Sequence, residues 1–173
     1  MTAIKCGIRQ VSLGLLLTLV SGIICAWAAD EYVAKANHLF QFARNVKWPP
    51  AKELAFCVIG PDPFGGALEA ALQGKKVAGR NVQLRRIGAA QAGGCQVLFI
   101  SGSSGGAQTA SALKQAGAST LTVGERSGFI QQGGIINFVI EGGRVRYEVN
   151  KSLADKKGLK LGYDIINLAK RRY

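Results

Sequence analysis

Alternating apolar and polar residues on both sides of Gly142-Gly143 predict a β-hairpin over residues 135–150, IINFVIEGGRVRYEVN. A two-residue hairpin loop needs positive φ angles at both positions, which glycine adopts without a steric penalty. The turn sets the register, because a slip of one residue would move every apolar side chain to the other face. One face then carries the pairs Ile136 with Val149, Phe138 with Tyr147 and Ile140 with Val145, and the other carries Asn137 with Glu148 and Val139 with Arg146. We therefore expect one buried face and one exposed, basic face.

The segment before the hairpin has the pattern of a parallel sheet. The runs 54–60 (LAFCVIG) and 96–101 (QVLFIS) are apolar without alternation, which is typical of strands that are buried on both faces. Weaker patterns predict an edge strand at 81–87, a further strand at 119–124, and helices at 65–73 and 107–116. The resulting order of strands and helices predicts an α/β fold with a mostly parallel sheet flanked by helices. The C-terminal hairpin adds an antiparallel edge.

Helical patterns also occur at both ends of this domain. Apolar residues at three- and four-residue steps predict a helix over 30–47 that ends before Pro49-Pro50. Lys35 falls among the polar positions of this helix. Near the C-terminus, Ser152-x-x-Asp155 matches a capping box and begins a final helical section. The charges of Lys170-Arg171-Arg172 suit the negative end of a terminal helix.

The first 28 residues have the pattern of a secretory signal peptide. Lys5 and Arg9 precede the apolar run 11–24, and Ala26-Trp27-Ala28 forms an A-x-A cleavage signal. The apolar run holds about 14 residues and is shorter than the roughly 20 that a membrane span needs, so an uncleaved anchor is the weaker alternative. We predict cleavage of residues 1–28 and a single exported domain over 29–173.

The net charge limits the classes of molecule that the protein is expected to bind. The chain has 22 Lys and Arg against 10 Asp and Glu, a net charge of +12. Removal of residues 1–28 takes away Lys5 and Arg9 and no acidic residue, which leaves 20 against 10, or +10. A basic exported protein can meet an anionic lipid, an acidic polymer or an acidic protein surface, whereas nucleic acid is not an expected partner there. Most of this charge is expected to be solvated surface.

Two cysteines, Cys57 and Cys95, remain after cleavage. A pair of cysteines in an oxidising compartment favours a disulfide over two buried free thiols. The bond would close a loop of 38 residues. By the chain-entropy relation, such a loop stabilises the fold by about 4 kcal/mol.

The sequence offers few catalytic groups. His38 is the one histidine, and a single histidine within a helix is more often a boundary residue than a general base. No cluster of His, Cys, Asp and Glu has the spacing of a metal site, and no Gly-x-Ser-x-Gly motif is present. We therefore expect no enzyme activity, no metal and no cofactor, and we hold a hydrolase with an unrecognised site to be the weakest hypothesis.

Two loops are candidate ligand sites. The segments 60–66 and 102–106 follow the two central strands, and ligands of α/β sheets bind at the carboxyl ends of parallel strands. Each loop leads into a helix N-terminus, which can accept an anion. The candidate contact residues are Asp62, Phe64, Gly65, Ser103 and Ser104. Ordinary strand-to-helix turns remain the simpler interpretation.

Several motifs in succession resemble the YfiR-like family of exported bacterial proteins. Residues 42–49 (FARNVKWP) are close to the F-x-[KR]-x-x-x-W-P element of that family. The other matching segments are 56–65, 94–101, 121–123 and 134–150. The resemblance covers nearly all of the predicted mature chain. One departure is Lys47, where the family often has an acidic residue before the tryptophan.

The resemblance implies a periplasmic regulator that binds the periplasmic sensor domain of an inner-membrane diguanylate cyclase and inhibits it, which lowers cyclic di-GMP. It further implies a peptidoglycan-associated outer-membrane lipoprotein that relieves the inhibition, a homodimer, and a disulfide at Cys57 and Cys95. A second cysteine pair of the well-known member is missing here, so redox switching through that pair is not expected. Candidate partner contacts are Arg44 and Trp48 of the first helix, and Arg144 and Arg146 of the hairpin, although Trp48 can equally be a core residue.

A second hypothesis is a periplasmic domain that senses or binds a small molecule through the loops 60–66 and 102–106. Such a domain would serve another output, such as a sensor kinase. The two hypotheses predict different contact surfaces, at the hairpin in one case and at the ends of the central strands in the other.

Overall fold

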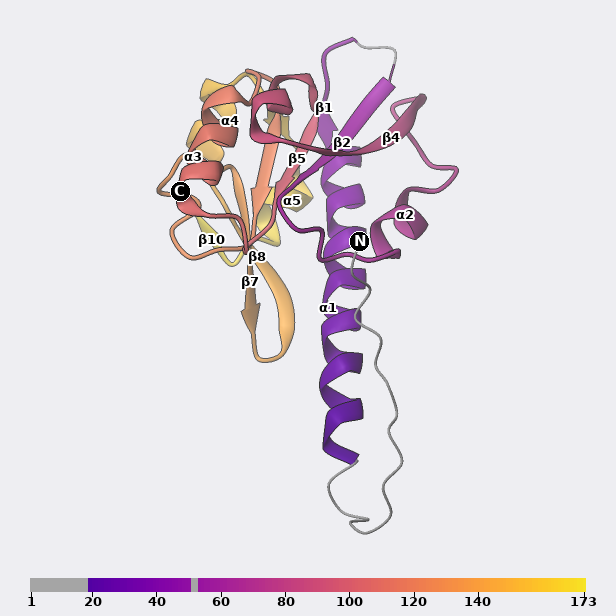
Figure 1. Ribbon diagram of the computed structural model, residues 1–173. Coiled ribbons are helices and arrows are strands. Elements are labelled where there is room, and N and C mark those ends of the chain that lie inside the picture. The colour runs from indigo at the N-terminus through magenta and orange to yellow at the C-terminus, as the bar shows by residue number, and fades with distance from the viewer. Residues whose placement is uncertain (1–18, 51–52) are drawn as a thin grey trace.

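The computed structural model describes the backbone of residues 19–50 and 53–173, and the side chains of residues 30–50 and 53–173. An eight-stranded sheet carries helices on both faces, and a two-stranded sheet lies beside it (Figure 1). The helices are α1 (Leu19–Arg44), α2 (Ala67–Leu72), the 3-10 helix η1 (Ala89–Gly94), α3 (Gly106–Gln115), α4 (Lys151–Lys156) and α5 (Tyr163–Asn167). The strands are β1 (Val46–Lys47), β2 (Glu53–Ile59), β3 (Lys76–Val77), β4 (Arg80–Ile87), β5 (Val97–Ile100), β6 (Leu121–Gly124), β7 (Ile136–Glu141), β8 (Arg144–Val149), β9 (Lys160–Leu161) and β10 (Arg171–Arg172).

The strand order of the large sheet is β10-β8-β7-β6-β5-β2-β4-β3. All the pairs from β4 across to β7 are parallel, whereas β3 pairs with β4, and β7 with β8, in the antiparallel sense. The predicted fold class is therefore confirmed: a mostly parallel sheet flanked by helices, with an antiparallel hairpin and a terminal helix near the C-terminus.

The central strand β2 is buried on both faces, as its continuous apolar run predicted. Its residues alternate between two cores. Leu54, Phe56 and Val58 pack with residues of α1 and α2, whereas Ala55, Cys57 and Ile59 pack with residues of η1 and α3. Because side chains of a strand point alternately to opposite faces, one strand supplies the centre of both layers.

The hairpin has the predicted register, with Phe138 opposite Tyr147 and Glu141 opposite Arg144. Its faces differ from the prediction at two places. Ile140 is 50% exposed, because β7 runs beyond the end of β6 and the hairpin tip projects from the sheet (Figure 1). On the face expected to be exposed, Asn137 is buried, and its neighbours in the sheet are Gly124 at the end of β6 and Glu148 of β8.

The helix α1 differs from the predicted helix at both ends. It begins at Leu19, within the predicted signal peptide, and ends at Arg44. Residues 1–18 of the predicted signal peptide lie outside the described residues, and so do all side chains before Asp30. Val46 and Lys47 leave the helix because they pair with β9. Among the residues that the structure describes, no helix has the length and apolar content that crossing a bilayer requires.

The C-terminal section corrects two predictions. The helix α4 is capped by Asn150, whose Oδ1 accepts a hydrogen bond from the backbone N–H of Leu153 at 2.9 Å, so the Ser152 capping box is wrong. The final helix α5 stops at Asn167, and Arg171 and Arg172 form β10, which pairs with β8. These two arginines therefore extend the sheet rather than oppose a helix dipole.

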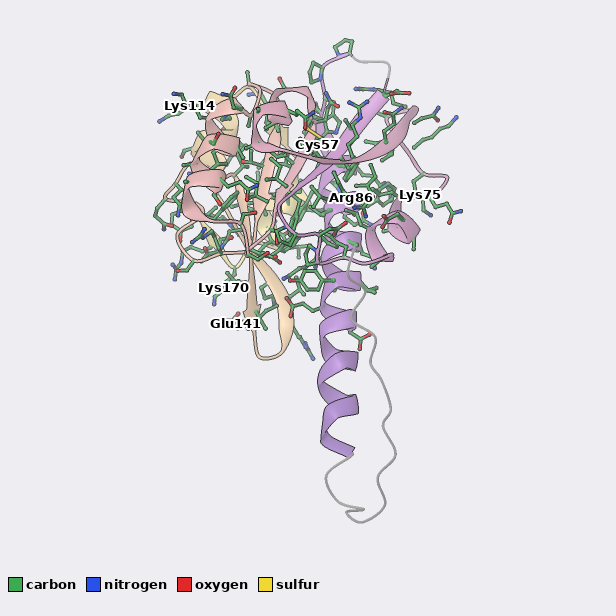
Figure 2. The ribbon with its side chains drawn as sticks, viewed as in Figure 1. Cys57, Lys75, Arg86, Lys114, Glu141 and Lys170 are labelled. Atoms are coloured by element: carbon green, nitrogen blue, oxygen red, sulfur yellow. A yellow bond between two sulfur atoms is a disulfide. The ribbon has the colours of Figure 1, made fainter. Side chains whose placement is uncertain are left out.

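Cys57 and Cys95 form the predicted disulfide. The bond joins β2 to the residue that follows η1, with a Cα–Cα distance of 5.9 Å across 38 positions of sequence. Both cysteines are buried. The bond ties η1 to the central strand on the face that α3 also covers (Figure 2).

Candidate functional site

A pocket of about 700 Å³ lies where the strands β5 and β6 end, and we call it the strand-end pocket. Residues 31–35 of α1 form one wall, and the start of β7 forms another. Ligands of α/β sheets bind at this edge, so the pocket occupies the region in which the sequence placed its candidate ligand loops. The lining of the pocket includes Glu31, Tyr32, Lys35, Ser103, Glu125, Arg126, Gln131, Asn137, Glu148 and Arg171.

A buried ion pair lies at the base of this pocket. Lys35 is 3% exposed, and its Nζ donates hydrogen bonds to Glu125 Oε2 at 2.6 Å and to Glu31. Glu125 Oε1 accepts a further bond from the backbone N–H of Gly102 at 2.9 Å. Burial by itself lowers the pKa of Lys35, but the hydrogen bonds to Glu125 and Glu31 outweigh burial and raise it above its usual value. The network fastens α1 to the ends of β5 and β6.

Asn137 lies on another wall of the strand-end pocket. Its side chain is 3% exposed, and Oδ1 finds no hydrogen-bond partner among the described residues. Asn137 is directly opposite Glu148 in the hairpin, and Glu148 is 15% exposed. Arg171 of β10 is close to this carboxylate, with Nη1 at 3.7 Å from Oε1. A buried amide oxygen without a donor is uncommon in folded proteins and calls for an explanation.

The five predicted ligand residues do not converge. Ser103 lines the strand-end pocket, where its hydroxyl lies 2.9 Å from that of Ser101. Asp62 turns away to an ion pair with Arg86, and Gly65 is exposed. Phe64 packs in the core between Tyr32 and Phe99, and Ser104 donates to the carbonyl of Ile59 at 3.3 Å. Three of the five, Asp62, Phe64 and Ser104, therefore have structural contacts away from the pocket.

The predicted partner residues also divide. Trp48 is 9% exposed, and its Nε1 donates to the carbonyl of Ala43 at 2.7 Å, so it belongs to the core. Arg44, Arg144 and Arg146 are exposed. Arg144 lies near Ala34 of α1. Because an α-helix rises about 1.5 Å per residue, Arg44 is roughly 15 Å further along the helix axis. Arg44 and the hairpin arginines therefore do not form one cluster.

A second hollow, of about 640 Å³, separates α1 from the hairpin, and we call it the α1–hairpin groove. Its lining is Asp30, Glu31, Ala34, His38, Ile140, Gly143, Arg144 and Val145. The C-terminal segment braces the hairpin from behind, since Lys170 Nζ lies 2.7 Å from Glu141 Oε1 (Figure 2). The outer wall of the groove carries Ile140, which is half exposed.

His38 lies at the base of the α1–hairpin groove among aromatic rings. Its ring centroid is 5.8 Å from that of Phe42 and 5.7 Å from that of Tyr147. Burial lowers the pKa of His38, and the positive charge of Arg146 lowers it further. The residue is thus a packed boundary histidine, as its position in a helix suggested, and the described residues contain no cluster of His, Cys, Asp and Glu that could hold a metal ion.

Sequence reasoning missed Lys35, Glu125 and Asn137. One signal for Lys35 was present, because it is three residues after Tyr32 and four before Leu39, both of which pack on the core side of α1. A lysine at such a position needs a carboxylate partner when it is buried. Nothing in the local sequence indicated that Glu125, 90 positions away, would provide it.

Comparison with known proteins supports both the fold and a family. Residues 32–170 match the family model described as YfiR/HmsC-like. No curated protein sequence is significantly similar to the chain. A conserved domain protein from Vibrio cholerae O1 biovar El Tor has a similar structure, with a TM-score of 0.54 and 12% identity over 80% of this chain and 60% of that one. The ABC domain from Streptococcus pneumoniae in complex with L-Trp gives a TM-score of 0.52 and 10% identity, with the same coverage. The chain thus spans about three fifths of each of these proteins, and the likeness concerns the fold.

Proposed function

Because the chain belongs to the YfiR/HmsC-like family, we propose that it is a periplasmic inhibitor that binds the sensor domain of an inner-membrane diguanylate cyclase. The family is one of periplasmic regulators in cyclic di-GMP signalling, and it is regulatory rather than catalytic. The observation that carries the proposal is the family match over residues 32–170, which covers the sheet, the hairpin and most of the C-terminal section.

The inhibition is explained by linkage. A protein that binds the inactive state of a sensor domain more tightly than the active state shifts the sensor toward inactivity by that difference in binding free energy. No catalytic group is required for this mechanism. Release by a peptidoglycan-associated outer-membrane lipoprotein would act in the opposite direction, by competing for the inhibitor. We also propose that the inhibitor acts as a homodimer.

The α1–hairpin groove is the contact surface that we favour. Its outer wall offers the half-exposed Ile140 together with the charged side chain of Arg144. Arg146 is also exposed, on the same strand as Arg144 and on the face of the hairpin opposite to Ile140. An apolar side chain with a nearby arginine has the composition that protein interfaces favour over the rest of the surface. Trp48 is left out of this surface, since it is a core residue.

Deletion of the gene tests the proposal in the cell. Cyclic di-GMP should rise in the deletion strain and return to its usual level when the gene is restored from a plasmid. A level that stays unchanged under several growth conditions would contradict the inhibitor and favour a different output, such as a sensor kinase. The strand-end pocket supports that second hypothesis, a domain that senses a small molecule.

Charge reversal tests the surface. The double variant Arg144→Glu and Arg146→Glu should bind the purified sensor domain at least about tenfold more weakly, since charged side chains at an interface contribute on this scale. The matched control is Lys75→Glu with Lys114→Glu, which makes the same change in net charge at exposed sites away from the hairpin (Figure 2). Equal affinities of the two double variants would remove the hairpin from the interface.

A further inference from the structure

The charged residues that line the strand-end pocket are three carboxylates and three cations, so their formal charges balance. Lys35 is bonded to Glu125 and Glu31, and Arg171 lies beside Glu148. Arg126 donates to the carbonyl of Ser104 at 2.8 Å. A charged ligand would have to displace one of these partners or leave a charge unmatched in a partly buried site, which is unfavourable. The pocket therefore selects against a ligand with a net charge of its own.

The groups with free hydrogen-bonding capacity are neutral. Asn137 Oδ1 is a buried acceptor with no donor among the described residues. Ser103, whose hydroxyl bonds that of Ser101 at 2.9 Å, and Gln131 are exposed and line the pocket. Amides and hydroxyls both donate and accept hydrogen bonds, and so do the hydroxyl groups of an uncharged ligand.

The hairpin places two acceptors side by side. Asn137 and Glu148 are directly opposite each other on β7 and β8, and cross-strand neighbours have Cβ atoms about 5 Å apart. An ionised carboxylate has about four lone-pair sites, so Glu148 can accept further bonds although it lies close to Arg171. Two neighbouring hydroxyl groups of one ligand can therefore donate to the amide and the carboxylate together.

We propose that the strand-end pocket binds a small uncharged polyol or sugar, with a vicinal diol donating to Asn137 and Glu148. The volume of about 700 Å³ lies in the range of small-molecule pockets. Ligand binding would supply the donor that Asn137 Oδ1 lacks among the described residues. The site involves neither Arg144 nor Arg146 and does not depend on the proposed inhibitory function.

Calorimetric titration of the purified protein tests the site. The probes are glucose, galactose and maltose, and the counter-probes are glycine, sodium acetate and inorganic phosphate. At least one sugar should bind with a Kd of about 1 mM or tighter, and the counter-probes should give no saturable heat. Absence of saturable binding for all three sugars at about ten times that concentration would overturn the proposal, as would binding of glycine, acetate or phosphate in their place.

Two variants link binding to the residues. Asn137→Leu keeps the size of the side chain and removes the unpartnered oxygen, and it should weaken sugar binding about tenfold or more. Asn81→Leu, at an exposed asparagine of β4 outside the pocket, should leave binding unchanged. Glu148→Gln provides the same test if Asn137→Leu does not fold. Sugar binding of unchanged affinity in the pocket variants would overturn the assignment.

Discussion

Lys35 is a buried charge whose role depends on two carboxylates. Its side chain and that of Glu125 are almost fully enclosed, with 4% and 7% exposed, whereas Glu31 is one-third exposed. Loss of one member of such a pair leaves the other charge buried without compensation, and this costs more than the pair itself contributes.

We predict that Lys35→Met lowers the free energy of unfolding by about 3 kcal/mol, because Glu125 keeps its charge in a buried position without a cation. Urea unfolding followed by circular dichroism measures the change. Lys151→Met is the matched control. Lys151 and Asp155 have the same i,i+4 spacing as Glu31 and Lys35, but both are exposed. An exposed pair contributes about 0.5 kcal/mol or less, so similar losses in the two variants would contradict this account.

His38 makes stability depend on pH. Burial among Phe42, Phe138 and Tyr147 holds its pKa below the usual 6.5, and Arg146 adds to this effect. The folded state therefore binds the proton less readily than the unfolded chain does. Stability from this group is full above pH 6.5 and is lost as the pH falls through that value toward the lower pKa of the folded state.

We predict that His38→Phe removes this loss of stability on acidification. The ring still packs against Phe42 and Tyr147 but cannot take up a proton. Thermal unfolding of both proteins across a pH series measures the effect, and the two curves of Tm against pH should differ in slope below about pH 6.5. Parallel curves in that interval would show that other groups cause the acid sensitivity.

At the scale of the element, α4 begins at a residue whose side chain accepts a hydrogen bond from a free backbone N–H group of the first turn. Asn150 fills this role, since it directly follows the last residue of β8 and turns the chain into the helix. Ser152 lies inside the helix and is exposed. Backbone placement by the preceding strand decided which of two suitable residues became the cap.

We predict that Asn150→Ala lowers the free energy of unfolding by about 1 kcal/mol, the usual effect of removing an N-cap. Ser152→Ala should change it by a few tenths of a kcal/mol at most, because alanine is the better helix former at an interior position. Chemical denaturation of both variants measures the difference. The reverse order of stability would restore Ser152 as the cap.

At the scale of the whole molecule, the net charge, +12 for the full chain and +10 after the predicted cleavage, matters for association rather than for folding. Arg144 and Arg146 are exposed at the hairpin, and Glu141, which is opposite Arg144, pairs with Lys170. Charges near an interface speed up association, and salt screens them over about 10 Å at 0.1 M.

We predict that the association rate with the sensor domain falls as NaCl is raised, and that the slope is shallower for the Arg144→Glu and Arg146→Glu variant. Surface plasmon resonance over a salt series measures both slopes. The Lys75→Glu and Lys114→Glu variant controls for the change in net charge and should keep a steeper slope than the hairpin variant. Equal slopes in the two variants would assign the salt effect to the overall charge.

The sequence by itself determined the six longer strands of the sheet, the hairpin register and the disulfide. Continuous apolar runs indicate buried parallel strands, and Gly142-Gly143 admits one short turn, so both signals act over a few residues. Cys57 and Cys95 were the two cysteines that remained beyond the predicted signal peptide, so no other pairing was available between them.

Tertiary structure alone decided the site. Lys35 meets Glu125 from 90 positions away, and Asn137 is buried at the start of β7, between Gly124 of β6 and Glu148 of β8. Arg171 and Arg172 became a strand because β8 offered a free edge. Periodicity reports which face of an element is apolar, but it carries no information on which distant charge or edge will lie next to it. Packing in the folded chain decides which residues that are distant in sequence come into contact.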